Sequence, residues 1–544
     1  MSPRSQQTVL LFLAPLLVAV VLMLPRLADP HFGFFDDTST IQIARRVLDG
    51  EWTAVLEGTR GRARPLYWLL YTAIYALAGA RPFWFFLGNT ILLCAIVVEV
   101  ILLAQDLGAD RRQASLAGLL FVLAGPVLEN VYTLSKPELQ QILWILLALL
   151  LAHRAGRWRG ARRMAAILLG GLAVLAACNT KETTVLLLPI SALWLTLGWG
   201  LRRLKAPGGD RGFLRDPALA LACFGGGLVY LASSSVYLAA DRLREGYASG
   251  FTFHLASVVA NFRIWLDWLN RDYLYLLPLF VLALLGFRAW RPRLAPILMW
   301  TIWMAIWLAI YLPWIFTPEY YLLPLALGAA LLGAQLVSWA LETAQASSRP
   351  MRIAGWTTLA LSGILWALTL PNSYTNGRLQ LAIDSANAEM IAYLSAAMPE
   401  DSVVLINLPV DGEYGTRFPG IVETFGDRTD LAVGLLAAED PESPARDGRG
   451  VALVLPVFKN EFYPSVRVGF YGHQTAAPNE AARELADGAP PVHRAVRTFR
   501  LFNVDAARLF CPVAPQIGYC AVPNTPFDRR LLEYGWEIYV IPSD

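Results

Sequence analysis

Two adjacent carboxylates, Asp36 and Asp37, closely follow the first apolar run of the sequence, and Phe34 and Phe35 stand in front of them. Partial removal from water and repulsion between neighbouring carboxylates both raise a carboxyl pKa, which favours general-base catalysis. Adjacent acids also cap surface helices, and residues 38–48 have the pattern of such a helix. The pair is therefore a candidate catalytic base, with helix capping as the alternative.

Three arginines, Arg60, Arg62 and Arg64, precede a short apolar segment at residues 65–80. Cations at such a place can hold a phosphate group at the membrane surface. Attraction to lipid head groups explains the same residues equally well. Arg64, next to the apolar segment, is the candidate phosphate ligand.

Two short loops place a lysine beside a carboxylate: Lys136 with Glu138, and Lys181 with Glu182. Charged groups are costly near hydrocarbon and usually face a polar cavity, although a lysine at a helix end can also extend its ammonium into water. We expect these four side chains to bind the sugar or phosphate of a substrate. A third segment adds two further candidates, Glu319 and Tyr320.

The elements around these residues are apolar. The chain has 544 residues, of which 56% are hydrophobic and 16% charged, too apolar a composition for an ordinary soluble enzyme. Apolar runs long enough to cross a bilayer recur up to residue 370, and none follows Pro371. The sequence predicts a membrane part at residues 1–371 and a soluble part at residues 372–544.

Arginine placement predicts the topology. Five arginine-rich loops fall in the cytoplasm by the positive-inside rule, and two apolar runs separate each from the next. We expect residues 65–80 to form an interfacial or re-entrant helix within a first extracytoplasmic loop at 27–81; as a tilted span it would place the N-terminus outside. Eleven spans are predicted, at 9–24, 82–104, 114–132, 138–153, 164–178, 183–201, 217–239, 272–287, 295–314, 320–341 and 353–370.

In this topology every acidic or mixed-charge motif among the apolar runs falls on the extracytoplasmic side, together with the soluble part. The long loop at 240–271 lies there too, and its residues 262–269 have the pattern of an amphipathic helix on the membrane. Convergence of the charged segments on one face predicts a site there. The protein is expected in the cytoplasmic membrane of a cell envelope.

Several classes of function lack support. The sequence has no glycine-rich nucleotide loop, zinc-ligand spacing or nucleophile elbow, and the net charge of +3 does not indicate a nucleic-acid partner. A membrane-borne substrate is therefore favoured over a soluble nucleotide donor. We expect no cofactor: the two acids can hold a divalent cation, but no third carboxylate stands near them.

These segments follow one another in the same order, and lie on the same side of the membrane, as those of a known family. They resemble the GT-C superfamily of lipid-linked glycosyltransferases, especially protein O-mannosyltransferases and lipid A aminoarabinose transferases. The resemblance covers about residues 1–340. It rests on Phe35-Asp36-Asp37, Arg64-Pro65-Leu66-Tyr67-Trp68, Thr180-Lys181-Glu182 and Tyr320-Tyr321-Leu322-Leu323-Pro324.

The resemblance implies that Asp36 is the base on an acceptor hydroxyl, with Asp37 as its neighbour, and that Arg64 binds the donor phosphate. Glu319 stands where family members often have arginine, and Pro65-Leu66 replaces a common pair of prolines. The first departure puts phosphate binding by the Glu319 loop in doubt, and the second matters less.

The expected function is an inverting hexosyl- or pentosyltransferase. It moves a sugar from a polyprenyl-phosphate donor to an extracytoplasmic hydroxyl of a glycan, lipid or protein. The alternatives are a transporter or flippase for a lipid-linked sugar, which predicts repeated halves that the sequence lacks, and a scaffold whose exported domain binds a partner.

The soluble part predicts an α/β domain, with a helix at 386–397 and strands at 402–408, 451–457 and 536–541. Cys511 and Cys520, nine residues apart, form a plausible disulfide in an oxidising compartment. The aromatic pairs at 462–463 and 470–471 contact either an acceptor sugar or the domain core.

Overall fold

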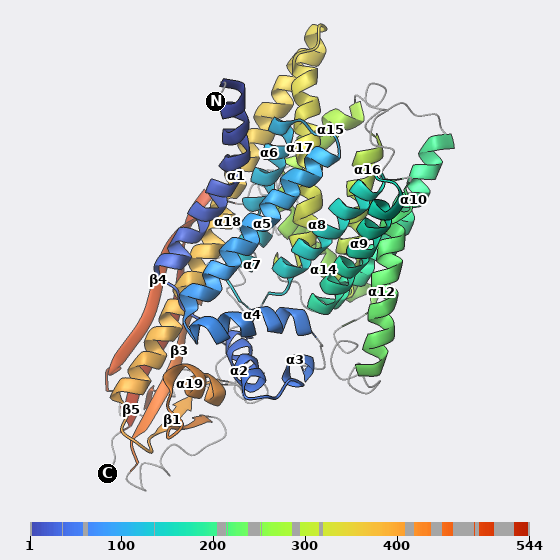
Figure 1. Cartoon of the computed structure of the whole chain (residues 1–544). Coiled ribbons are helices and arrows are strands. Elements are labelled where there is room, and N and C mark those ends of the chain that lie inside the picture. The colour runs from blue at the N-terminus through green and yellow to red at the C-terminus, as the bar shows by residue number, and fades with distance from the viewer. Residues whose placement is uncertain are drawn as a thin grey trace.

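The computed structural model describes most of the chain (Figure 1). The described residues are 3–34, 36–57, 64–134, 136–203, 214, 216–237, 251, 253–285, 294–314, 319–408, 418–436, 449–460, 483–484, 489–504 and 527–541. Phe35, Arg60, Arg62, Cys511, Cys520 and the aromatic pairs at 462–463 and 470–471 lie outside them, as does the side chain of Asp36.

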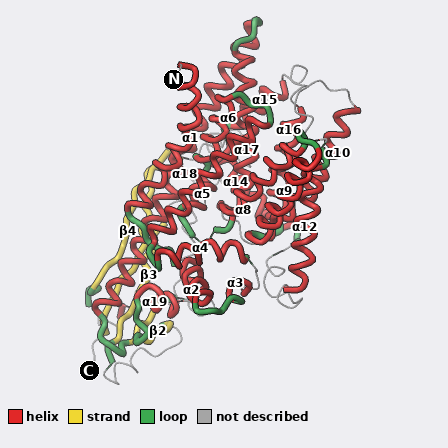
Figure 2. The backbone as a smooth tube through the Cα atoms, in the orientation of Figure 1, coloured by secondary structure: helices red, strands yellow, loops and turns green. Residues whose placement is uncertain are grey.

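Helices dominate the described chain, as the tube in Figure 2 shows. The helices of the first half are α1 (Pro3–Ala28), α2 (Asp36–Leu48), α3 (Ala54–Glu57), α4 (Pro65–Ala78), α5 (Pro82–Asp106), α6 (Arg111–Val122), α7 (Gly125–Val131), α8 (Glu138–Ala155), α9 (Gly160–Thr180), the 3-10 helix η2 (Glu182–Leu186), α10 (Leu187–Arg203) and α12 (Ala218–Tyr237). The later helices are α14 (Leu255–Tyr273), α15 (Leu276–Leu285), α16 (Leu294–Tyr311), the 3-10 helix η5 (Glu319–Leu322), α17 (Leu323–Ala344), α18 (Arg349–Ala397) and α19 (Phe418–Gly426).

The chain is a multi-pass membrane protein. In the part of the chain that the structure describes, seven helices are long and apolar enough to cross a bilayer, or eight if one bent pair counts as a span. Four shorter apolar helices accompany them, at Pro65–Ala78, Ala218–Ser233, Leu276–Leu285 and Ala295–Tyr311. The count of eleven spans stays a prediction.

The expected span at 114–132 is broken into two helices. Helix α6 ends at Val122, and α7 begins at Gly125 at an angle of 61° to it. Pro126 lies in the first turn of α7, where its missing N–H leaves no hydrogen bond unmade. An apolar run therefore predicted the membrane segment but not the bend within it.

The predicted short helix at 65–80 is confirmed as a separate helix, α4, of 14 residues. Figure 1 shows α4 lying across the end of the bundle beside α2 and α3. Its buried aromatic side chains, Tyr67, Trp68 and Tyr71, share a core with Phe85 on α5. The predicted helix at 262–269 lies within α14, which buries Trp265 and Trp268.

The C-terminal domain contains a five-stranded sheet in the order β2-β1-β3-β5-β4. Strand β1 pairs in parallel with β2 and β3, whereas β5 pairs antiparallel with β3 and β4. The three predicted strands are confirmed by β1, β3 and β5, and two further strands accompany them. The strands are β1 (Val403–Ile406), β2 (Ala432–Leu435), β3 (Val451–Asn460), β4 (His493–Val504) and β5 (Phe527–Ile541).

One helix joins the membrane part to this sheet. Helix α18 runs for 49 residues, contains Pro371 and continues through the predicted boundary after residue 371. Its last turns pack on the sheet, where Asn387 accepts hydrogen bonds from Tyr534 and Trp536. The change in composition at residue 372 therefore occurs inside a continuous helix, and the division into two domains stays a prediction.

Candidate active site

The acid pair begins helix α2. The Asp37 side chain is buried, 3% exposed, and its Oδ2 accepts a hydrogen bond of 2.7 Å from the backbone N–H of Gly33. This bond joins the second residue of α2 to the turn that leads into the helix. It differs from an N-cap, in which the side chain accepts a hydrogen bond from an N–H two or three residues further along the chain. Both interpretations of the acid pair stay predictions. Asp36 lies one residue earlier, at the first position of the helix.

A buried ion pair supports the same turn. Arg26, near the end of α1, pairs with Asp384 on α18, and neither side chain is exposed. Gln380 also donates a hydrogen bond of 2.9 Å to Asp384, and the Arg26 guanidinium lies 3.9 Å from the centre of the Phe86 ring. These residues were not predicted. The available signal was Arg26 itself, an arginine at the expected extracytoplasmic end of the first span.

The C-terminal domain packs against the acid-bearing segment. Phe34 belongs to the core of that domain, with its ring centre 5.7 Å from that of Phe418 and 6.3 Å from that of Trp536. On α2, Gln42 donates a hydrogen bond of 3.1 Å to the hydroxyl of Thr424 on α19. Helix α2 is therefore held by the sheet domain as well as by the bundle.

The predicted lysine of the second loop forms a buried ion pair. Lys181, 2% exposed, donates a hydrogen bond to Glu138, 1% exposed, and its ammonium lies 4.3 Å from the centre of the Tyr321 ring. Burial lowers the pKa of Lys181 to about 8, although the charge of Glu138 opposes this shift. The structure thus pairs Lys181 with Glu138 of the neighbouring loop.

Arg64 and Glu182 complete this cluster. The Nε atom of Arg64 lies 3.6 Å from a carboxylate oxygen of Glu182, and the side chains are 11% and 28% exposed. Arg64 and Glu182 both act electrostatically on Lys181. Four of the predicted residues therefore gather around the start of α4, the loop before α8 and the turn between α9 and η2.

The tyrosine segment connects the two lysines. The Lys136 ammonium lies 3.9 Å from the centre of the Tyr320 ring, and the rings of Tyr320 and Tyr321 are 4.5 Å apart. The backbone carbonyl of Tyr320 accepts a hydrogen bond of 3.1 Å from Asn130 on α7. Helix η5 therefore presents one aromatic face to each lysine.

Glu319 is the first residue of η5, and its buried side chain lies beside the start of α7. A Cβ atom at Gly125 would lie 1.9 Å from Glu319 Oε1 and 3.0 Å from Asp272 Oδ1. Glu319 and Asp272 are 1% and 6% exposed, so two buried carboxylates meet at this glycine. Asp272 was not predicted; it is the first residue of the span expected at 272–287, where a carboxylate next to a loop is typical of a solvated span end.

Tyr71 bridges the acid pair and the cation cluster. Its hydroxyl donates a hydrogen bond of 2.8 Å to Asn89, whose amide group bonds to the carbonyls of Val131 and Thr133, just before Lys136. Burial and the nearby charge of Asp37 both raise the pKa of Tyr71. The acid turn and the lysine loop are therefore connected through α4 and α5.

Comparisons with known proteins place this arrangement in a fold. No family model and no curated protein sequence matches the chain. The structure is similar to that of ArnT from Cupriavidus metallidurans in the apo state, with a TM-score of 0.53, 13% identity and 98% of each chain covered. This chain has the GT-C fold.

Two further structures with the GT-C fold are similar. ArnT bound to undecaprenyl phosphate gives a TM-score of 0.50 and 14% identity over 96% of this chain and 97% of that one. The archaeal oligosaccharyltransferase AglB from Archaeoglobus fulgidus, in complex with an inhibitory peptide and a dolichol-phosphate, gives 0.49 and 11% over 80% and 65%. The likeness to ArnT extends through the C-terminal domain, beyond the expected residues 1–340.

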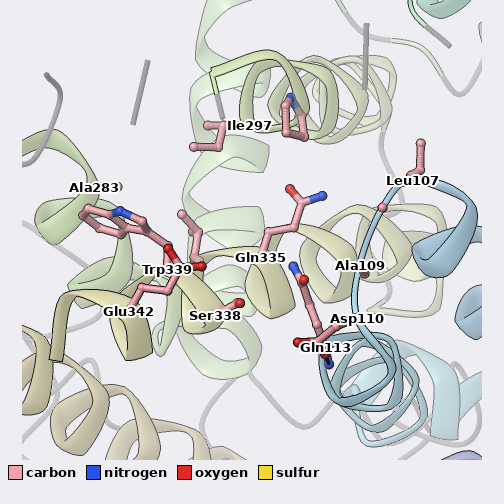
Figure 3. Close-up of a pocket in the computed structure, with 13 residues that line it drawn as sticks. Leu107, Ala109, Asp110, Gln113, Ala283, Ile297, Gln335, Ser338, Trp339 and Glu342 are labelled. Atoms are coloured by element: carbon pink, nitrogen blue, oxygen red, sulfur yellow. Dashed lines mark hydrogen bonds between the residues drawn. The ribbon is translucent and has the colours of Figure 1, made fainter. Parts of the chain in front are cut away.

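A cavity of about 340 Å³ lies at the opposite end of this GT-C bundle (Figure 3). It is lined by the loop between α5 and α6 and by residues of α6, α15, α16 and α17, including Asp110, Gln335 and Glu342. None of the predicted site residues lines it. The candidate active site is therefore the cluster at the end of the bundle beside the C-terminal domain.

No group of three or more histidine, cysteine or acidic side chains arranged to hold a metal ion occurs among the residues that the structure describes. Two carboxylates of the candidate site are instead matched with a cation or a backbone N–H group: Glu138 with Lys181, and Asp37 with Gly33. The absence of a cofactor stays a prediction.

Proposed function

We propose that this protein is an inverting glycosyltransferase that moves a sugar from a polyprenyl-phosphate carrier to a hydroxyl group of an extracytoplasmic acceptor. The observation that carries the proposal is the meeting of two ion pairs, the buried Lys181–Glu138 pair and the partly exposed Arg64–Glu182 pair, at the end of the bundle that bears the acid pair. The GT-C fold, shared along the chain with ArnT in its undecaprenyl-phosphate complex, supports a lipid-phosphate donor.

The cations suit a leaving phosphate. Arg64 is only loosely paired with Glu182, at 3.6 Å, so a phosphate with closer, bidentate hydrogen bonds can displace that carboxylate. Lys136 and Lys181 lie on the faces of two adjacent tyrosines and add positive charge nearby. Glu138 and Glu182 balance these cations when the donor is absent, and Glu319 and Tyr320 contribute to sugar binding.

The reaction is a single displacement. Asp36 takes the proton of the acceptor hydroxyl while its oxygen attacks the anomeric carbon and the bond from that carbon to the phosphate oxygen breaks. Polyprenyl phosphate leaves with the electron pair, and Arg64, Lys136 and Lys181 stabilise its charge. Attack from the face opposite the phosphate inverts the anomeric configuration, and Asp37 keeps the start of α2 in place.

We place the protein in the cytoplasmic membrane, with the candidate site and the C-terminal domain on the extracytoplasmic side, because the described arginines of the expected cytoplasmic loops, such as Arg154 and Arg163, lie at the other end. Transfer needs no divalent cation in this mechanism. Transfer that stopped on addition of EDTA would contradict that part of the proposal.

The test uses the purified full chain in vesicles supplied with radiolabelled polyprenyl-phosphate sugars and hydroxyl-bearing acceptors. Labelled product whose anomeric configuration is inverted relative to the donor is the expected result. Movement of the labelled donor across the bilayer without transfer would instead favour the flippase.

A further inference from the structure

Arg26 and Asp384 tie the first helix of the bundle to the last. They are 358 positions apart in the sequence, and both side chains are fully buried in the ion pair. The Nε and Nη1 atoms of Arg26 are buried and have no hydrogen-bond partner among the described residues. The Phe86 ring, 3.9 Å from the guanidinium, and the Asp384 carboxylate together fix its position.

Gly33 connects the Arg26–Asp384 ion pair to the turn that leads into α2. A Cβ atom at Gly33 would lie 3.2 Å from Asp384 Oδ1 and 3.2 Å from Asp37 Oδ2, so both carboxylates lie beside this residue, on the side where a Cβ would project. The Gly33 N–H donates to Asp37. A continuous path of contacts therefore runs from α1 through α18 to the first turn of α2.

Stability alone is a poor reason for such a pair. Removing two charges from water offsets much of their attraction, and apolar side chains of similar size often stabilise a core equally well. What an ion pair adds is a defined relative orientation of the groups it joins. Here those groups are α1, α18 and the turn at Gly33.

We propose that Arg26 and Asp384 are positioning residues that act through Gly33 to hold the start of α2, and hence Asp36, in the geometry needed for proton removal. This inference rests on the proposed function. Because Asp384 lies one turn before Asn387, which bonds to β5, the C-terminal domain takes part in the same positioning.

Three variants test the proposal against a matched control. Asp384→Asn keeps the shape and removes the charge, Arg26→Met with Asp384→Leu replaces the pair by apolar groups, and Arg26→Asp with Asp384→Arg exchanges the charges. The control is Arg163→Met with Asp216→Leu, which removes an ion pair of 2.9 Å at the opposite end of the bundle.

We expect kcat to fall about 100-fold in Asp384→Asn and in the apolar pair, because a misplaced catalytic group slows reaction far more than binding. The donor KM should change less than about threefold. The exchanged pair should recover about tenfold of the loss, and the control should transfer at the native rate. Unchanged kcat in both Asp384→Asn and the apolar pair would overturn the proposal.

A second readout does not depend on transfer. Amide hydrogen exchange at residues 33–40 should become faster in the apolar pair and in Asp384→Asn, while exchange in α9 and α12 stays as in the native protein. Native exchange at 33–40 in both variants would overturn the proposed link through Gly33. If the native protein transferred no sugar from any donor, the proposed function would fail, and exchange at 33–40 would still decide whether the pair holds the turn.

Discussion

The two ends of the helical bundle use charge in different ways. At the arginine-rich end, Arg154 pairs with Asp106 at 3.0 Å, and these side chains are 38% and 18% exposed. At the end beside the C-terminal domain, the Lys181–Glu138 and Arg26–Asp384 pairs are almost or fully buried.

The contrast separates two uses of ion pairs. Partly exposed pairs are screened by water, contribute little to stability and fit a face whose positive charge sets topology. Buried pairs carry a desolvation penalty, and we infer that this end tolerates it because the charges act on a substrate or position a residue that does.

Breaking one ion pair at each end of the bundle should give the largest difference in stability and in the rate of transfer. Lys181→Met leaves Glu138 buried without its partner, and the free energy of unfolding should fall by about 3–5 kcal/mol. Transfer should fall about 100-fold or more, because a cation facing the leaving phosphate is lost. Chemical denaturation in detergent and the transfer assay measure the two effects.

The matched control is Arg163→Met, which leaves Asp216 at 13% exposure at the opposite end. Its loss of stability should be under about 1 kcal/mol, with native transfer. Equal losses in the two variants would remove the distinction between the ends.

The pH dependence of transfer should report the protonation state of Lys181. Its ammonium is charged below a pKa of about 8 and loses its proton above it, whereas arginines at either end stay charged. Transfer should therefore decline by up to about tenfold per pH unit above 8. In Lys181→Arg this alkaline decline should disappear, and its persistence there would assign it to another group.

Alanine substitutions at two glycines compare the packing of the site with that of a peripheral helix. Gly125→Ala forces Glu319 to move, since the new Cβ atom would lie 1.9 Å from its Oε1, and we expect a loss of about 1–3 kcal/mol in the free energy of unfolding. Gly225→Ala on α12 meets nothing within 4 Å and should stabilise that helix by up to about 1 kcal/mol. Thermal unfolding of both variants is the measurement, and a tolerated Gly125→Ala would contradict the tight contact.

The C-terminal sheet provides an intermediate case. Burial raises the pKa of Glu537, but hydrogen bonds from Arg483 and Tyr539 outweigh it and leave the pKa below its ordinary value of 4.5. The carboxylate therefore stabilises the domain above pH 4.5 and loses this effect as the pH falls through its lower folded-state pKa. Arg483→Met should cost under about 1 kcal/mol at pH 7, and the difference from the native protein should vanish in acid. A difference that persisted in acid would indicate lost packing instead.

Local sequence patterns predict the charged loops but not the ion pairs between residues that are far apart in the sequence. A lysine beside a glutamate in a short loop between apolar runs is visible in the sequence, but in the structure Lys181 pairs with Glu138 of the other loop. Nothing in the sequence matches Arg26 to Asp384, because their meeting depends on how α1 and α18 pack.

The same limit applies to the fold. The apolar strands β1 and β3 are buried and were predicted, while β4 carries arginines such as Arg497, which pairs with Glu389 on α18 and so conceals the strand pattern. The bend between α6 and α7 was hidden within one apolar run. Composition thus predicts which segments are buried, but bends and partners depend on tertiary contacts.

The most direct test of the account compares one carboxylate at each end of the bundle. Transfer from a labelled polyprenyl-phosphate sugar is measured in vesicles for Asp36→Asn and for Asp106→Asn, whose carboxylate pairs with Arg154 at the arginine-rich end. The account predicts a loss of about 100-fold or more for Asp36→Asn and native transfer for Asp106→Asn. Native transfer by Asp36→Asn would contradict it.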